Sequence, residues 1–244
     1  MDNHRTLTDL GNCFICPNRQ HSEWKELGND ELQQIVDANR CRKFLPGDVL
    51  FHQGDACLGV YCIHSGVVGI RKVDIEGNSM LLSLAHPSET LGYRALLSGR
   101  EHTVSAEVLK EGTVCFIGNK TIRCLIDQNP TLGHRFLGRA IKDLEDAEEK
   151  FMKGMTLSVR ARFAHLLLVL KDRQIKAVKD NKSLVLELPL ARKDLAEMIG
   201  IRPETLSRAI RQLEEDGVAE FSGRTVRVAD ISCLINELGG DESF

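Results

Sequence analysis

The segment ARKDLAEMIGIRPETLSRAIRQLEEDGVAEF, residues 191 to 221, decides the fold. A helical pattern stops at Gly200, and a second helix restarts at Pro203, a residue favoured at the first position of a helix. Residues 218 to 228 are typical of two strands joined by a tight turn. Two helices with a short turn and a following β-hairpin form a DNA-binding unit, so the sequence predicts a winged helix-turn-helix.

Polar side chains share the exposed face near the start of the second helix. Glu204, Ser207 and Arg208 are spaced i, i+3 and i+4, at the end of a recognition helix that enters the major groove. Arginine can grip guanine with two hydrogen bonds, glutamate accepts from cytosine, and serine can meet either kind of base. We therefore expect these three residues to read DNA bases. The candidates for phosphate contacts are Arg192, Lys193, Arg202, Arg211 and Arg224. The alternative is a solvated polar face used for protein contacts.

Composition limits the classes of protein that fit. The chain has 244 residues and a formal net charge of −3, but residues 158 to 228 hold 14 basic and 10 acidic residues. The basic excess therefore lies with the predicted DNA-binding segment. No apolar run is long enough to cross a bilayer, so we expect no membrane insertion. The eight scattered cysteines, without an apolar leader, favour a cytoplasmic protein.

Residues 41 to 117 consist of short β-rich runs separated by turn pairs such as Pro46-Gly47, which predicts a compact antiparallel β-roll. The roll lacks a His-x-His motif with a downstream Glu, so an enzymatic alternative, a cupin-like oxygenase, has no support. We expect an α+β protein and not an enzyme. Its expected parts are a cysteine-containing segment at 1–28, a β-roll sensor domain at 29–130, a dimerisation helix at 131–157 and a winged helix at 158–244.

The expected long helix carries an apolar stripe at three- and four-residue spacing, which is interpreted as the seam of a homodimer. The residues assigned to the seam are Leu137, Ile141, Leu144, Ala147 and Phe151. The alternative is packing of this stripe on the β-roll. Acidic residues, among them Glu145 and Glu148, flank the stripe and would face their copies in a parallel dimer. Like charges oppose pairing, so we expect dimerisation to be tunable.

The order of β-roll, long helix and winged helix resembles the CRP/FNR family of bacterial transcription regulators. PGDVLFHQGD (46–55) and VYCIHSGVV (60–68) are similar to the family's sensor roll, and RPETLSRAIRQLEEDG (202–217) is similar to its recognition helix. Glu204, Ser207 and Arg208 match the FNR type, the fumarate and nitrate reduction regulators. The resemblance implies a homodimer on double-stranded DNA, at a palindromic promoter site with TTGAT-like half-sites, and RNA polymerase as a partner.

The resemblance also bears on the ligand of the roll. Cyclic-AMP receptors of this family hold the nucleotide with a glutamate and with the arginine of an Arg-Ser or Arg-Thr pair. Thr90 occupies the glutamate position here, and His102-Thr103 replaces the pair. We therefore do not expect a cyclic nucleotide, although Arg94 or Arg100 could substitute as the phosphate anchor. His102 is interpreted as a surface or turn residue.

FNR-type regulators hold an oxygen-labile four-iron four-sulfur cluster through an N-terminal cysteine cluster and one distant cysteine in the roll. The resemblance places Cys13, Cys16 and Cys115 on these positions, and Ser22 where a third N-terminal cysteine is expected. It thus implies an iron–sulfur cofactor that lacks one of its usual thiolates. The candidates for the missing ligand are His21, Glu23, Cys41 and an acid on the dimerisation helix.

Other interpretations of the same cysteines stay open. One is a metal-free thiol switch, in which Cys13 or Cys16 forms a disulfide with its neighbour or with Cys115. A second is zinc, held by the three thiolates and His21. A third is a regulator that binds a small-molecule effector in the β-roll. Cys57 and Cys62 lie in or beside expected strands and are interpreted as small buried hydrophobic residues.

Overall fold

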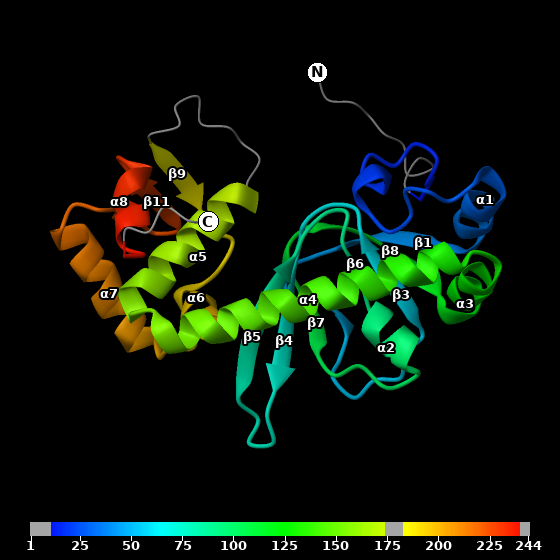
Figure 1. Ribbon diagram of the computed structural model, residues 1–244, viewed down its shortest axis with the longest axis horizontal. Coiled ribbons are helices and arrows are strands. Elements are labelled where there is room, and N and C mark those ends of the chain that lie inside the picture. The colour runs from blue at the N-terminus through cyan, green and yellow to red at the C-terminus, as the bar shows by residue number, and fades with distance from the viewer. Residues whose placement is uncertain (1–10, 174–182, 240–244) are drawn as a thin grey trace. The chain divides into compact units, whose positions relative to one another are not determined.

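The structure, a computed structural model, describes residues 11–173 and 183–239 (Figure 1). Contacts between residues divide the chain into two compact units, residues 1–144 and 145–244. The boundary falls inside helix α4 (Pro130–Thr156), the helix that was expected at residues 131–157. Within the described ranges, no helix combines the length and the apolar character that a membrane span needs.

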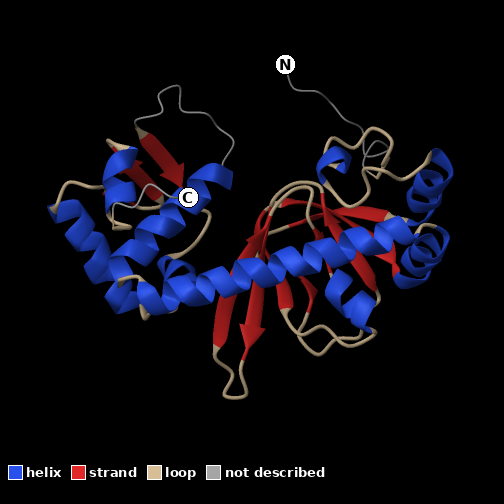
Figure 2. Cartoon of the chain, viewed as in Figure 1, coloured by secondary structure: helices blue, strands red, loops and turns tan. Residues whose placement is uncertain are grey.

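Strands dominate the first unit and form two four-stranded antiparallel sheets (Figure 2). The first sheet has the order β1-β8-β3-β6 and the second β2-β7-β4-β5. The predicted antiparallel β-roll is therefore confirmed. The strands are β1 (Arg40–Phe44), β2 (Val49–Phe51), β3 (Gly59–Ile63), β4 (Val67–Val73), β5 (Ser79–Ala85), β6 (Thr90–Leu91), β7 (Ser105–Lys110) and β8 (Gly112–Gly118).

The first sheet is covered on both faces, which places its alternate residues in two separate clusters. On β3, Ile63 joins the cluster between the two sheets, whereas Val60 joins a second cluster on the opposite face. Helical residues such as Leu32, Ile122 and Phe136 complete this second cluster. The helices that contribute to it are α1 (Asn29–Ala38), α2 (Tyr93–Ser98), α3 (Asn119–Gln128) and the first part of α4. We call this face of the sheet its helical face.

The second unit is a winged helix, as the sequence predicts. Helix α6 ends before Gly200, whose φ of 68° lies in the left-handed region that favours glycine, and α7 begins at Pro203. Leu206, Ile210 and Leu213 of α7 are buried. The three-stranded sheet has the order β10-β11-β9. The elements are α5 (Val159–Arg173), β9 (Leu184–Glu187), α6 (Arg192–Met198), α7 (Pro203–Glu215), β10 (Glu220–Ser222), β11 (Thr225–Val228) and α8 (Ile231–Asn236).

Candidate thiol site and nucleic-acid interface

The N-terminal segment from Gly11 to Gly28 is a loop with one 3₁₀ turn, η1 (Arg19–His21). Ser22, at the position where a cysteine was expected, donates a hydrogen bond to the carbonyl oxygen of Arg19 (2.8 Å) and closes this turn. The amide of Asn18 donates to the carbonyl oxygen of His64 (2.7 Å), at the end of β3. The first bond shapes the loop that carries Cys13 and Cys16, and the second ties this loop to the first sheet.

A row of three cysteines crosses the first sheet. Cys115 on β8 lies opposite Cys41 on β1 and also opposite Cys62 on β3. Residues directly opposite each other in an antiparallel sheet point to the same side, and Cys62 packs in the cluster on the helical face. Cys41 and Cys115 form a disulfide, so the partner of Cys115 is neither Cys13 nor Cys16, the partners considered for a thiol switch. Cys13, Cys16 and Cys62 are free thiols.

The loop and the row of cysteines meet at a cavity of about 50 Å³. Four cysteines line it, namely Cys13, Cys16, Cys62 and Cys115. The three cysteines expected as ligands are therefore brought together, and Ser22 lines the same cavity. Cys62 was missed by the sequence reasoning, because it was interpreted only as a small core residue. No pattern in the sequence signals this position, because it follows from the register that pairs Cys62 with Cys115 across the sheet.

Two of the free thiols that line the cavity, Cys13 and Cys62, are held in their neutral form. Burial, with a smaller effect of the nearby Cys16, raises the pKa of Cys13 to about 11 against the opposing effects of Asn39 and Arg19. Burial also raises the pKa of Cys62, with smaller contributions from Cys13 and from the carboxylate of Glu23. A neutral thiol is a weak nucleophile, whereas a bound metal deprotonates its cysteine ligands. The two cysteines are therefore weak nucleophiles as free thiols, and a metal that bound them would have to displace their protons.

The donors around the cavity fit an iron–sulfur cluster. The indole Nε1 of Trp24, a residue only 7% exposed, is buried without a hydrogen-bond acceptor among the described residues, and Trp24 lines the cavity. A sulfur anion in the cavity would supply the missing acceptor. In the described ranges, no group of three His, Cys, Asp or Glu residues is arranged as a preformed metal site. Cys115 becomes available as a thiolate once its disulfide with Cys41 is reduced.

The candidates that the sequence offers for the fourth ligand are exposed, engaged in other contacts or outside the cavity. His21 is exposed. Glu23 is buried, but its carboxylate accepts a hydrogen bond from the hydroxyl of Thr90 (2.8 Å). Cys41 is bonded to Cys115 and is not among the residues that line the cavity. On α4, the carboxylate of Asp143 accepts a hydrogen bond from the hydroxyl of Tyr93 (2.5 Å).

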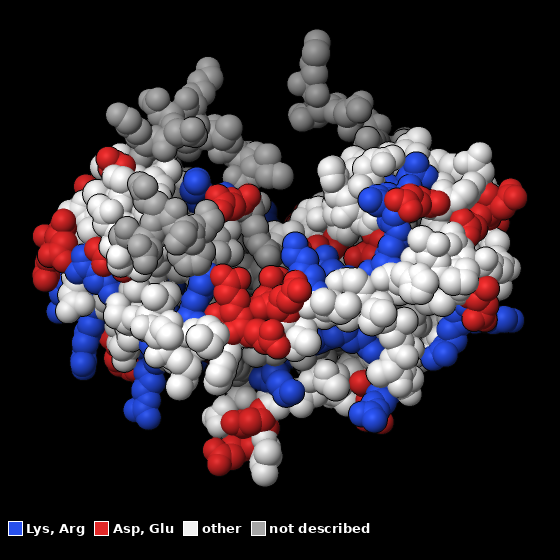
Figure 3. Space-filling model, in the orientation of Figure 1, with Lys and Arg blue, Asp and Glu red and all other residues white. Residues whose placement is uncertain are grey.

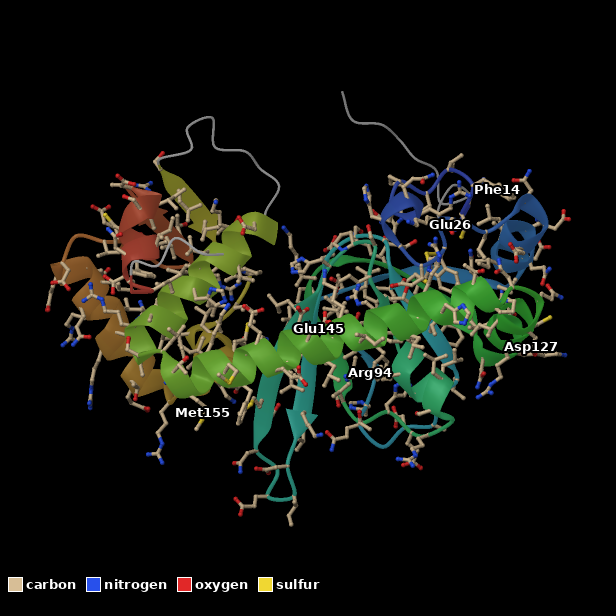
Figure 4. The ribbon with its side chains drawn as sticks, viewed as in Figure 1. Phe14, Glu26, Arg94, Asp127, Glu145 and Met155 are labelled. Atoms are coloured by element: carbon tan, nitrogen blue, oxygen red, sulfur yellow. A yellow bond between two sulfur atoms is a disulfide. The ribbon has the colours of Figure 1, made fainter. Side chains whose placement is uncertain are left out.

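The positions that hold a cyclic nucleotide in cyclic-AMP receptors are filled differently. His102 is buried and stacks on Phe51, with ring centroids 3.9 Å apart, so its interpretation as a surface or turn residue was wrong. Burial lowers the pKa of His102, which leaves the ring neutral near pH 7. His102 therefore offers a cyclic phosphate no positive charge. Arg94, labelled in Figure 4, and Arg100 are both exposed.

The face of α7 expected to read bases is free. Glu204, Ser207 and Arg208 are all exposed, and the hydroxyl of Ser207 donates to the carbonyl oxygen of Pro203 (3.0 Å). Neither Glu204 nor Arg208 has a hydrogen bond or ion pair with another described side chain. The apolar face of α7 is fixed in the core by Leu206, so the polar face points outward.

Exposed basic residues surround this face, and Figure 3 shows Lys and Arg side chains projecting from the surface around α7. The five residues expected to contact phosphates, Arg192, Lys193, Arg202, Arg211 and Arg224, are all exposed. Arg160 on α5 holds the C-terminal end of α7. Its guanidinium forms an ion pair with Asp216, the C-cap residue of α7, and a second one with Glu237 (2.5 Å). Helix α7 is thus held at both its apolar face and its C-terminal end.

Helix α4 exposes most of the stripe expected as a dimer seam. Leu137, Ile141, Leu144 and Phe151 are 51 to 68% exposed, and Ala147 is also exposed. Spacing of four and three residues continues from Leu144 through Glu148 and Phe151 to Met155, so an acid occupies one position of the stripe. Figure 4 labels Glu145 and Met155 on this helix. An exposed apolar stripe with heptad spacing is typical of a helix that pairs with a second copy.

Comparison with known proteins gives matches along most of the chain. A cyclic nucleotide-binding domain matches residues 41–129, and a Crp-like helix-turn-helix domain matches residues 161–236. The transcriptional activator protein FnrL of Cereibacter sphaeroides is 26% identical over 243 residues, which cover 98% of this chain and 96% of FnrL. The nitrogen fixation regulation protein FixK of Bradyrhizobium diazoefficiens is 29% identical over 205 residues, 84% of each chain.

Solved structures share the fold. FixK2 from Bradyrhizobium japonicum has a TM-score of 0.70 at 22% identity, and the match covers 81% of this chain and 96% of FixK2. The c-di-GMP responsive regulator CLP of Xanthomonas campestris has a TM-score of 0.71 at 19% identity, with 82% and 99% covered. At these sequence identities the two structures show only that the fold is shared.

Proposed function

Because the chain belongs to the CRP/FNR family of DNA-binding transcription regulators, of the FNR type, we propose that it is a cytoplasmic homodimer that reads TTGAT-like inverted repeats under the control of a redox site. The redox site comprises Cys13, Cys16 and Cys115. The observation that carries this part of the proposal is the cavity that brings the three cysteines together from a loop and a strand far apart in the sequence. RNA polymerase is the proposed partner at the promoter.

Sequence-specific binding rests on the free face of α7. Each bidentate contact of Arg208 with guanine is worth about 1–3 kcal/mol, so Arg208→Ala should weaken binding about 5- to 150-fold for each half-site. Fluorescence anisotropy with a duplex that contains a TTGAT palindrome measures this loss, and a scrambled duplex measures non-specific binding. Arg211→Ala is the matched control, since a phosphate contact should affect both duplexes equally. Unchanged discrimination in Arg208→Ala would contradict the assignment.

The redox site would be an iron–sulfur cluster held by Cys13, Cys16 and Cys115. When bound, such a cluster supplies an oxygen-labile redox centre. The chain's own part is to hold the N-terminal loop against the first sheet, as Asn18 does through its hydrogen bond to the carbonyl oxygen of His64. Iron, acid-labile sulfide and the visible spectrum of protein purified without air test this assignment directly.

The structure connects this loop to the dimerisation helix. Trp24, which lines the cavity, packs edge-on against Phe136 of α4, with ring centroids 5.4 Å apart. Arg135, next to Phe136, forms an ion pair with Glu26 and donates to the carbonyl oxygen of Glu23 (3.5 Å). A change at the cysteines would therefore reach α4 through packed side chains. It would shift α4 between an arrangement in which two copies of its apolar stripe pair and one in which the neighbouring acidic residues keep the two copies apart.

A thiol switch of the same fold is the second candidate, and the disulfide between Cys41 and Cys115 favours it. Forming this bond removes two protons and two electrons from the two thiols, which a peroxide or a disulfide such as oxidised glutathione can accept. Colourless, iron-free protein whose DNA binding still depends on added thiol reductant would establish this candidate over the cluster.

A further inference from the structure

One cysteine of the cavity has no role in the function proposed above. Cys62 lines the cavity with Cys13, Cys16 and Cys115, and so completes a set of four thiols. We propose that Cys62 is the fourth ligand of the cluster and replaces the cysteine that the N-terminal segment lacks at Ser22. The inference rests on the proposed cluster and adds a residue to its ligands.

The register of the first sheet puts Cys62 in the right place. It lies directly opposite Cys115, and side chains in such pairs have β-carbons about 4.5–5.5 Å apart. Two thiolates at this separation can bind two different irons of one cluster. On the loop side, Cys13 and Cys16 line the same cavity as Cys62, and Cys13 packs against the same core cluster as Cys62. The four sulfurs thus enclose the cavity from two strands and one loop.

Polar groups around Cys62 are arranged for a sulfur anion. Trp24 lines the same cavity as Cys62 and is buried there. The indole N–H is the buried donor that lacks an acceptor at hydrogen-bonding distance among the described residues. Arg19 also lines the cavity and adds a positive charge. Hydrogen bonds and charge around the ligand sulfurs are the means by which proteins tune such clusters.

The same row of cysteines explains why Cys62 is a better ligand than Cys41. Cys115 lies between the two, opposite one on each side. The bond to Cys41 uses the sulfur of Cys115, whereas the cavity is lined by Cys115 and Cys62 and not by Cys41. Reduction of the disulfide consumes two electrons and two protons and releases Cys115 as a thiol. The ligand set of Cys13, Cys16, Cys62 and Cys115 is then complete without a residue from outside the cavity.

The test compares cluster content in full-length variants. Wild-type protein, Cys62→Ser and Cys57→Ser are purified without air and reconstituted with ferrous iron, sulfide and a thiol reductant. Cys57 is a matched control, because it packs against the same core but does not line the cavity. Iron and acid-labile sulfide per protomer, together with the visible spectrum, are measured. We expect Cys62→Ser to bind at least about tenfold less iron and sulfide per protomer than the wild type, and Cys57→Ser to bind as much as the wild type.

A rescue variant separates loss of a ligand from loss of folding. Ser22 lines the same cavity, so Ser22→Cys added to Cys62→Ser supplies a fourth thiolate at the position usual in the family. Restored iron and sulfide in this double variant would support the proposal, because a cysteine added at position 22 would not repair a misfolded chain. His64→Ala is the rival arm, since its Nδ1 lies 3.7 Å from the sulfur of Cys16. Full loading of Cys62→Ser would overturn the inference, as would loss of the cluster only in His64→Ala.

The outcomes also distinguish this inference from the proposed function. Wild-type protein that takes up neither iron nor sulfide would refute the cluster and the role of Cys62 together. A loaded wild type with an equally loaded Cys62→Ser refutes only the role of Cys62. Zinc bound without sulfide would refute the cluster, whereas its loss in Cys62→Ser would keep Cys62 as a metal ligand.

Discussion

Replacing Glu148 with leucine tests whether the exposed stripe of α4 is a dimer seam. Glu148 is exposed, lies between Leu144 and Phe151 in the heptad spacing and has no ion pair with another described residue, unlike Glu149, which pairs with Lys153. In a parallel dimer two Glu148 carboxylates about 8 Å apart would repel each other by about 0.5–2 kcal/mol at an effective dielectric constant between about 20 and 80.

The Glu148→Leu substitution has a second effect besides removing this repulsion, because the leucine side chains would be buried in the dimer. Its neighbours Leu144 and Phe151 are 59% and 68% exposed in one protomer, so about half of a leucine side chain would become buried on pairing. That burial is worth about 1.5–3 kcal/mol for the two copies. The combined effect of about 2–5 kcal/mol should lower the dissociation constant of the dimer roughly 30-fold to 4,000-fold. Sedimentation equilibrium over a range of protein concentrations, with air-exposed protein, measures it.

Asp146→Leu is the matched control, since it removes the same charge and adds the same side chain outside the heptad positions of the stripe. It should leave the dissociation constant within about threefold of the wild type, because exposed substitutions away from contacts change free energies by about 0.5 kcal/mol. Equal effects of the two substitutions, or a monomeric Glu148→Leu at concentrations where the calculation predicts dimer, would refute the assignment of the seam.

Further predictions concern stability and redox state. Burial lowers the pKa of His102 below its ordinary value of 6.5, so the first unit should lose stability as the pH falls below 6.5 and the unfolded chain takes up the proton first; denaturant unfolding at pH 7.5 and 5.5 should show this loss in the wild type but not in His102→Leu. Arg160→Ala breaks the ion pairs to α7 and α8 and should destabilise the second unit by about 1–3 kcal/mol, seen as a lower thermal midpoint, whereas no change would mean that these pairs are fully offset by solvation. Cys41→Ser should leave Cys115 open to alkylation in air-exposed protein, as mass spectrometry after trapping would show; protection of Cys115 in this variant would reveal another partner.

The DNA-reading face could be predicted because its information is local. The helix break at Gly200, the start at Pro203 and the spacing of Glu204, Ser207 and Arg208 all lie within nine residues, so helix geometry alone puts the three side chains on one face. The β-roll was predictable as a class for a similar reason, since strands and turns alternate along the chain. Neither required knowledge of which strands pair.

The thiol site depends on contacts between distant segments. Cys41 and Cys115 are 74 residues apart, and only the pairing of β1 with β8 and its register place them opposite each other. A shift of one residue on β3 would turn Cys62 to the other face of the sheet. His102 was misinterpreted for the same reason, because this loop residue is buried against Phe51 of the distant strand β2. Sequence patterns contain no record of register, so these neighbours could not be anticipated.

If the proposed cluster forms, the shared position of Cys115 would make the regulator respond to two conditions at once. A supply of iron and sulfide would be insufficient while Cys115 is bonded to Cys41, and a reducing thiol pool would be insufficient without iron and sulfide. Cells that return to low oxygen would regain the active form only after both are restored. The regulator would then keep a memory of its last oxidation, and its activation would lag behind its inactivation.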